Sequence, residues 1–185
     1  MRFPNALKVS VGMVLVAAAA CVESPQAGQE RPGGGPAGDP DLFFLVQAAL
    51  LNVGEVEAGR VAAERAVSPE VKEFARRMIE EHTKAQRDLT ELAGKKGVEV
   101  PSKPDEAHAM LVSHLSKLEG RRFDAEYLAL MTAAHARAVS LFESKVRLAR
   151  DPEIRAWAER TLPALREHWR MARDLAGKAA GAGER

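Results

Sequence analysis

The segment SPEVKEFARRMIEEHTKAQRDLTELAGK, residues 68–95, recurs without a gap as DPEIRAWAERTLPALREHWRMARDLAGK, residues 151–178. The two copies lie 83 residues apart and share nine identical positions, and further pairs such as Phe74 and Trp157 are conservative exchanges. A repeat this long, with helical periodicity inside it, indicates a duplicated supersecondary unit rather than a solenoid of short repeats. Each unit reads as a helical hairpin. The sequence therefore predicts an all-α four-helix bundle built from two duplicated hairpins.

Start and stop signals place the four long helices. Ser68 and Asp151 are N-cap residues, each followed by proline at the first helical position, and glycines mark the expected ends. The helices are predicted at about 41–66, 69–94, 121–150 and 152–177. The turns within each hairpin are short, so the paired helices should be antiparallel neighbours. A crossover linker over 95–120 should hold a short helix with His108 and His114 on its surface. The bundle domain is thus 41–177, and 178–185 is expected to be a flexible tail.

The N-terminus has the pattern of an export signal. Basic residues precede a twelve-residue apolar stretch, Val9 to Ala20, which is too short to span a bilayer as a helix. Ala18-Ala19-Ala20-Cys21 then resembles the lipobox of a bacterial lipoprotein, which makes 1–20 a signal peptide and Cys21 a lipidated first residue. The alternative is an ordinary secretory signal cleaved near Ala20. Residues 21–40 are rich in glycine and proline and are expected to form a tether.

The charge balance and the cysteine content limit the classes of partner and cofactor that the protein can bind. Lys and Arg together number 27 and Asp and Glu 26, so nothing in the charge balance favours nucleic-acid binding. Cys21 is the only cysteine, so the mature domain has no thiolate for a disulfide or an iron–sulfur cluster. The expected partner is a membrane, reached through the lipid on Cys21. Val22 rather than Asp follows the cysteine. By resemblance to lipoprotein sorting in enterobacteria-like cells, this favours anchoring in the outer membrane and a periplasmic location.

A polar layer is expected in the core. Glu55, His82, His135 and His168 interrupt the apolar stripes of the four helices, one residue from each. Counted from the hairpin turns, all four fall near mid-helix, so they should meet at one level of the bundle.

Two interpretations of this layer stay open. The residues could form a structural hydrogen-bond layer that fixes helix register. They could instead bind a transition metal, because three imidazoles and a carboxylate suit zinc, iron or copper. Met78, Met131 and Met171 each lie one turn from a histidine, which could favour Cu(I), although methionine is also a common core filler. The chain contains no Glu-x-x-His of di-iron bundles and no recognisable nucleophile–base pair, so no catalytic residue is assigned.

Four strings support a family resemblance: GEVEAGRVA at 54–62, VKEFARRMIEEHTKAQRDLTELAGKKGV at 71–98, FDAEYLALMTAAHARAVSLFE at 123–143 and LPALREHWRMARDL at 162–175. They resemble the bacterial family catalogued as domain of unknown function 4142, a ferritin-like bundle whose members are often labelled outer-membrane proteins. The resemblance puts six residues on recurrent family positions: Glu55, His82, Asp124, His135, Pro163 and His168. It implies a fold and an envelope location but no reaction.

The sequence thus predicts an exported, lipid-anchored bundle of the cell envelope without an evident catalytic site. The alternative is a periplasmic metal-binding protein that uses the central layer.

Overall fold

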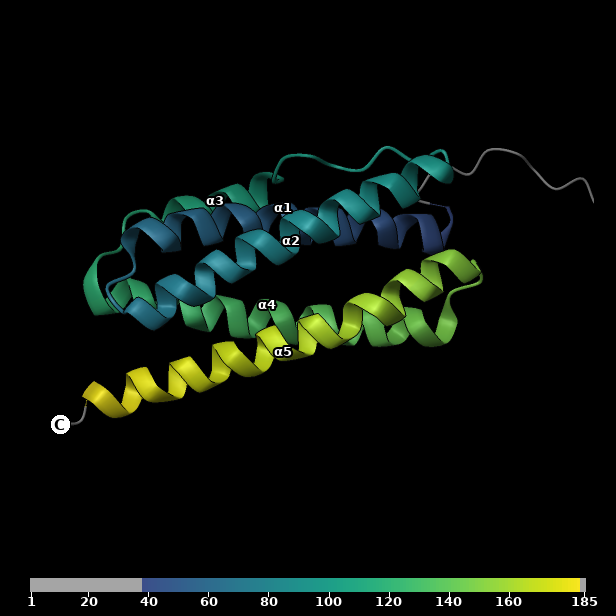
Figure 1. The fold of residues 1–185 in the computed structure, drawn as a ribbon. Coiled ribbons are helices and arrows are strands. Elements are labelled where there is room, and N and C mark those ends of the chain that lie inside the picture. Colours follow the sequence, from purple (N-terminus) through teal and green to yellow (C-terminus); the bar gives the residue numbers. More distant parts are fainter. Residues whose placement is uncertain (1–37, 184–185) are drawn as a thin grey trace, which may run out of the picture. The chain divides into compact units, whose positions relative to one another are not determined.

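The computed structural model describes residues 38–183, which lie in one compact unit, and five helices occupy that range (Figure 1). The predicted signal peptide, Cys21 and nearly all of the predicted tether lie outside the described residues. The helices are α1 (Pro40–Arg65), α2 (Pro69–Lys95), α3 (Glu106–Leu115), α4 (Gly120–Leu148) and α5 (Pro152–Gly183).

Helix ends follow local sequence signals. Asp39, Ser68 and Asp151 cap α1, α2 and α5 by accepting hydrogen bonds from backbone N–H groups of the first turn, and a proline follows each of them. The α2 C-terminus closes at Gly97, whose φ of 70° few other residues adopt, with Val98 N–H donating to the carbonyl of Ala93.

The two hairpins pack side by side, α1 against α4 and α2 against α5 (Figure 1). Asp41, at the start of α1, accepts hydrogen bonds from the N–H groups of Arg150 and Asp151 at 2.7 and 2.8 Å, in the turn of the other hairpin. Asp124, at the start of α4, accepts equivalent bonds from Val67 and Ser68 at 3.0 and 2.8 Å. Every residue in one set lies 83 positions from its counterpart, so each hairpin caps the turn of the other about a pseudo-two-fold axis.

Aromatic packing repeats the same relation. Phe44 lies edge-on to Trp157 with ring centroids 5.9 Å apart and an interplanar angle of 62°. Tyr127 and Phe74, the residues related by the repeat, lie 6.2 Å apart at 60°. The duplication thus produces two similar apolar clusters, one towards each end of the bundle. All four long helices contribute to the first cluster, which confirms a core shared by both hairpins.

Two details of the sequence-based prediction were wrong. The tail expected from 178 is helical through Gly183, because the repeat places Ala180 where α2 is followed by Gly97 with its positive φ, and alanine favours a helix. His114 is exposed as expected, but His108 is half-buried, with its ring against α1 at Gly54. A Cβ at Gly54 would overlap that ring, so this glycine permits α3 to lie close to α1.

α1 is long and apolar enough to span a membrane by length and composition alone. Apolar residues along it, such as Phe44, Leu45 and Ala62, pack in the two core clusters of the bundle, and Glu55 lies near its centre. This helix therefore has the burial pattern of a core helix.

Candidate metal centre

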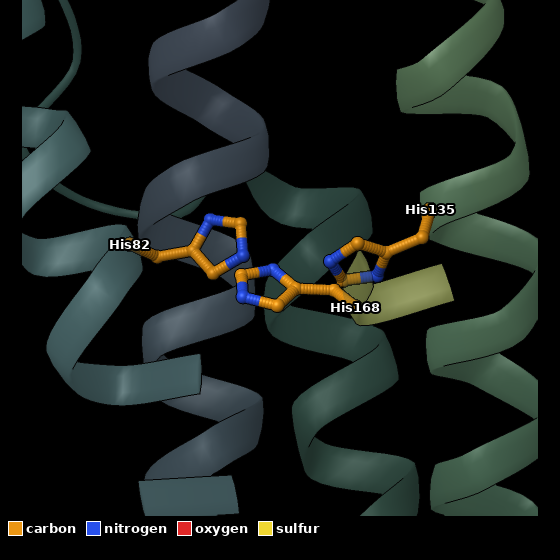
Figure 2. A group of neighbouring side chains, drawn as sticks. All are labelled: His82, His135 and His168. Atoms are coloured by element: carbon orange, nitrogen blue, oxygen red, sulfur yellow. The ribbon is translucent and has the colours of Figure 1, made fainter. Parts of the chain in front are cut away.

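The polar layer lies between the two apolar clusters. His82 on α2, His135 on α4 and His168 on α5 point toward one another (Figure 2), and a potential ligand atom of each lies within 4.8 Å of those of the other two. Their ring centroids are 5.2 to 5.5 Å apart. Glu55 reaches the same layer from α1, with Oε2 3.0 Å from His82 Nε2 and Oε1 3.6 Å from His135 Nδ1. No member is more than 4% exposed. The structure thus brings together all four residues singled out in the sequence.

A chain of amides fixes the tautomer of His82. The carbonyl of Pro101 can only accept, so Gln86 donates to it through Nε2 and offers Oε1 to the Nδ2 of Asn52. The Oδ1 of Asn52 then faces His82 Nδ1 at 3.0 Å, which makes Nδ1 the protonated nitrogen. His82 Nε2 therefore carries a lone pair and is directed into the layer.

The other two rings are fixed in a similar way. His135 Nδ1 donates to the carbonyl of Met131 at 3.0 Å, one turn earlier in α4. His168 Nε2 donates to Glu81 Oε2 at 2.8 Å, and Glu81 in turn accepts from Arg77 Nε at 2.7 Å. His135 Nε2 and His168 Nδ1 are consequently left with lone pairs.

Those lone pairs have no hydrogen-bond partner among the described residues. The unsatisfied buried atoms include His82 Nε2, His135 Nε2, His168 Nδ1 and Glu55 Oε1. Glu55 Oε2 is close to His82 Nε2, but the two atoms are not aligned as a hydrogen bond. Leaving such atoms buried and unpaired is costly, and a deprotonated imidazole nitrogen repels a carboxylate at this distance. A cation shared by these atoms removes both penalties.

Burial and charge set the protonation of the layer. Burial lowers the pKa of His82, and it lowers the pKa of His168 to about 4, with the neighbouring imidazoles adding to the effect. Burial alone would raise the pKa of Glu55, but positive charge on His135, His82 and His168 would hold it below its ordinary value. The carboxylate thus favours a positive charge in the layer, whereas His82 and His168 resist protonation. A metal ion is a positive charge that does not require a proton on either ring.

Several contributing residues were not assigned to the site from the sequence. Asn52 had a signal, because it aligns with His135 in the internal repeat. Glu81 had no such signal in the sequence, because it lies beside the apolar stripe of α2 and is only half-buried, as many surface glutamates are. Tyr127 is buried, its hydroxyl has no partner among the described residues, and burial together with Glu55 raises its pKa.

The methionine pattern is only partly consistent with a sulfur-rich site. Met78 and Met131 are buried in the cluster that adjoins the layer. The sulfur of Met171 instead accepts a contact from Arg77 at 3.2 Å. Nitrogen and oxygen atoms therefore make up the donor set that the geometry defines.

These features define a class of protein: a duplicated helical bundle whose core is divided by a layer of three imidazoles and a carboxylate. The family described as "Domain of unknown function (DUF4142)" matches residues 26–175. The chain belongs to this family, as its sequence strings indicated, and its fold is an all-α, ferritin-like bundle.

Solved structures share the fold at low identity. A DUF305 fragment from Deinococcus radiodurans is 18% identical with a TM-score of 0.67, over 76% of this chain and 97% of the other. A DUF305 protein from Streptomyces coelicolor is 17% identical with a TM-score of 0.66, over 76% and 92%. A structure described as "CopM in the Cu(II)-bound form" is 16% identical with a TM-score of 0.62, over 75% and 95%. No curated protein matches the chain.

Proposed function

We propose that this protein is an exported, envelope-located bundle that binds one transition-metal ion in its central layer. The ligands are His82 Nε2, His135 Nε2 and His168 Nδ1, with Glu55 as the anionic fourth ligand. One observation carries the proposal: each ring donates its single N–H to a partner outside the cluster, which leaves one lone pair per ring facing its centre. Metal-binding histidines are commonly oriented in this way by a carbonyl or carboxylate.

A purely structural layer explains the geometry less well. Such a layer would gain stability by satisfying its polar atoms, and a half-satisfied buried network is costly. Here one nitrogen of every ring and one oxygen of Glu55 remain without a partner among the described residues. The hydrogen bonds that are present orient the rings, and the atoms left over are those that a metal needs.

The donor set narrows the choice of metal. Three imidazole nitrogens and a carboxylate suit Zn²⁺, Cu²⁺ or Fe²⁺ better than the hard ions Ca²⁺ and Mg²⁺, which prefer oxygen ligands. The neighbour described as Cu(II)-bound supports Cu²⁺ as the first ion to test. The proposal covers metal binding alone and assigns no catalytic role.

The envelope location rests on the N-terminal sequence. We attribute export to the signal peptide at 1–20 and anchoring to a lipid on Cys21, with the glycine- and proline-rich segment that follows as the tether and the outer membrane as the destination. The Streptomyces coelicolor neighbour carries the description "secreted protein", which supports an extracytoplasmic location.

Metal titration of the purified domain tests the function. Wild type should bind one Cu²⁺ or Zn²⁺ per chain, and a metal concentration one hundredfold above Kd should add about 2.7 kcal/mol to the unfolding free energy. The triple variant of His82, His135 and His168 to alanine should lose both effects. His114→Ala removes an exposed histidine and is the matched control for surface binding. Wild type that binds no more metal than a folded triple variant would refute the proposal.

A further inference from the structure

The ligand atoms are sealed inside the bundle, so a metal ion needs a way in. Each of the candidate nitrogens has less than 1 Å² of accessible surface. The outward hydrogen bond of each ring therefore marks one possible direction of access, and the three directions differ in chemistry.

Two of these directions are closed by neutral groups. Behind His82 lie the amides of Asn52 and Gln86, and the latter is tied to the carbonyl of Pro101 in the crossover linker. Behind His135 lies the backbone carbonyl of Met131 in its own helix. Among the described residues, the hydrogen-bond partners behind these two rings therefore carry no charge.

The third direction is different. The partner of His168 is Glu81, whose side chain is 34% exposed while that of His168 is 2% exposed. Among the histidines of the described layer, His168 alone is hydrogen-bonded to a carboxylate that also faces solvent. The other oxygen of Glu81 accepts a hydrogen bond from Arg77 Nε at 2.7 Å, so the carboxylate is held between the histidine and the partly exposed surface of α2.

Glu81 also lies at one end of a groove. This groove runs between α2 and α5 with a volume of about 650 Å³. The small side chains of Ala85, Ala156 and Ala164 leave it open, and further along it Asp88 and Glu91 are paired with Lys84 and Lys95. The groove therefore connects solvent with Glu81, the partly exposed carboxylate that is hydrogen-bonded to His168.

We infer that Glu81 receives the metal ion from this groove and admits it past His168 into the layer. The inference rests on the proposed function, since it describes how that site is filled. A cation on the Glu81 carboxylate competes with the His168 hydrogen bond. Release of that bond frees the imidazole to turn about its Cβ–Cγ bond, and the ion passes to Nδ1, which already carries a lone pair. No proton needs to be lost or gained in this ligand exchange.

The test measures rates and affinity separately in the full domain. Stopped-flow mixing with Co²⁺, whose visible absorption reports coordination, gives the association rate, and equilibrium titration gives Kd. Glu81→Gln keeps an oxygen that accepts from His168 but removes the charge. We expect this variant to bind and release Co²⁺ about tenfold more slowly with Kd changed by less than about threefold. Asp88→Asn, another groove carboxylate, is the matched control and should match wild type.

A second variant tests the groove itself. Ala164→Phe fills the groove near Glu81 and should slow association without altering the final absorption spectrum. An unchanged association rate in Glu81→Gln, or equal slowing in Asp88→Asn, would overturn the inference. A weaker Kd with an unchanged association rate would also overturn it, because Glu81 would then only position His168. If wild type binds no Co²⁺ at equilibrium, the proposed function itself fails, so the two failures are distinguishable.

Discussion

Replacing Asp124 by alanine should show how much the reciprocal capping of the two hairpins contributes to stability. The Asp124 carboxylate is 5% exposed and accepts hydrogen bonds from the N–H groups of Val67 and Ser68 in the other hairpin. Asp124→Ala removes both bonds and leaves two partly buried donors without that acceptor. Because a hydrogen bond to a charged group contributes about 1.5–3 kcal/mol, the loss of both bonds should cost about 3–6 kcal/mol.

The symmetry of the fold supplies the comparison. Asp41→Ala removes the equivalent pair of bonds to Arg150 and Asp151, and it also leaves the buried ammonium of Lys145 without its carboxylate at 2.8 Å. It should therefore cost more than Asp124→Ala. Asp105→Ala removes the exposed cap of α3 and should cost only about 1 kcal/mol.

Urea unfolding followed by far-UV circular dichroism measures these losses, with the m-value checked to be unchanged. A loss below about 1 kcal/mol for Asp124→Ala would refute the argument, since it would mean that the turn N–H groups find water or another partner at no cost. Equal losses for Asp124→Ala and Asp105→Ala would refute it too.

Three further outcomes are expected. The metal-free domain should lose stability as pH falls from about 6.5 towards 4, because the unfolded chain binds a proton in this range while folded His168, with its pKa lowered to about 4, does not. The loss should be on the order of 3 kcal/mol. Urea unfolding at several pH values measures it, and no such loss would be seen if the folded ring were already protonated. Gly54→Ala should displace His108 and loosen α3, which amide hydrogen exchange would show as faster exchange in that helix; unchanged exchange in α3 would contradict this packing. Gly94→Ala is the control, because its added Cβ meets nothing within 4 Å, and it should stabilise the protein by about 1 kcal/mol. Cys21→Ser should release the full-length protein from membranes, and an unmodified mature N-terminus by mass spectrometry would exclude the lipid anchor.

The sequence predicted the layer residues because helical spacing is local. His82 follows Met78 by one turn on an apolar stripe, and the same reasoning brought the other three residues to mid-helix. Burial of all four was therefore predictable. Their partners were not, because Asn52 and Glu81 reach the rings from neighbouring helices whose rotation depends on packing across the bundle.

The internal repeat could not have revealed the layer by itself. His82 corresponds to Leu165 and His168 to Ala85, so three imidazoles arise where the duplicated pattern is broken. Asp41 and Asp124 show the opposite case. Their correspondence was visible in the sequence, but their role as caps for each other's hairpin turn was not, because no local pattern links residues so distant along the chain.

The sequence by itself determined the hairpins, their duplication, the family and the four polar core residues, since caps, prolines and apolar periodicity act within a few residues of the backbone. The tertiary structure decided which polar group each imidazole contacts, which nitrogen of each ring is left without a partner among the described residues, and that the partner of His168 is partly exposed. Those properties depend on contacts such as the one between Glu81 and His168, 87 residues apart in the chain. Such contacts exist only after the four helices have packed, because side-chain directions across a bundle are fixed by interdigitation rather than by sequence spacing.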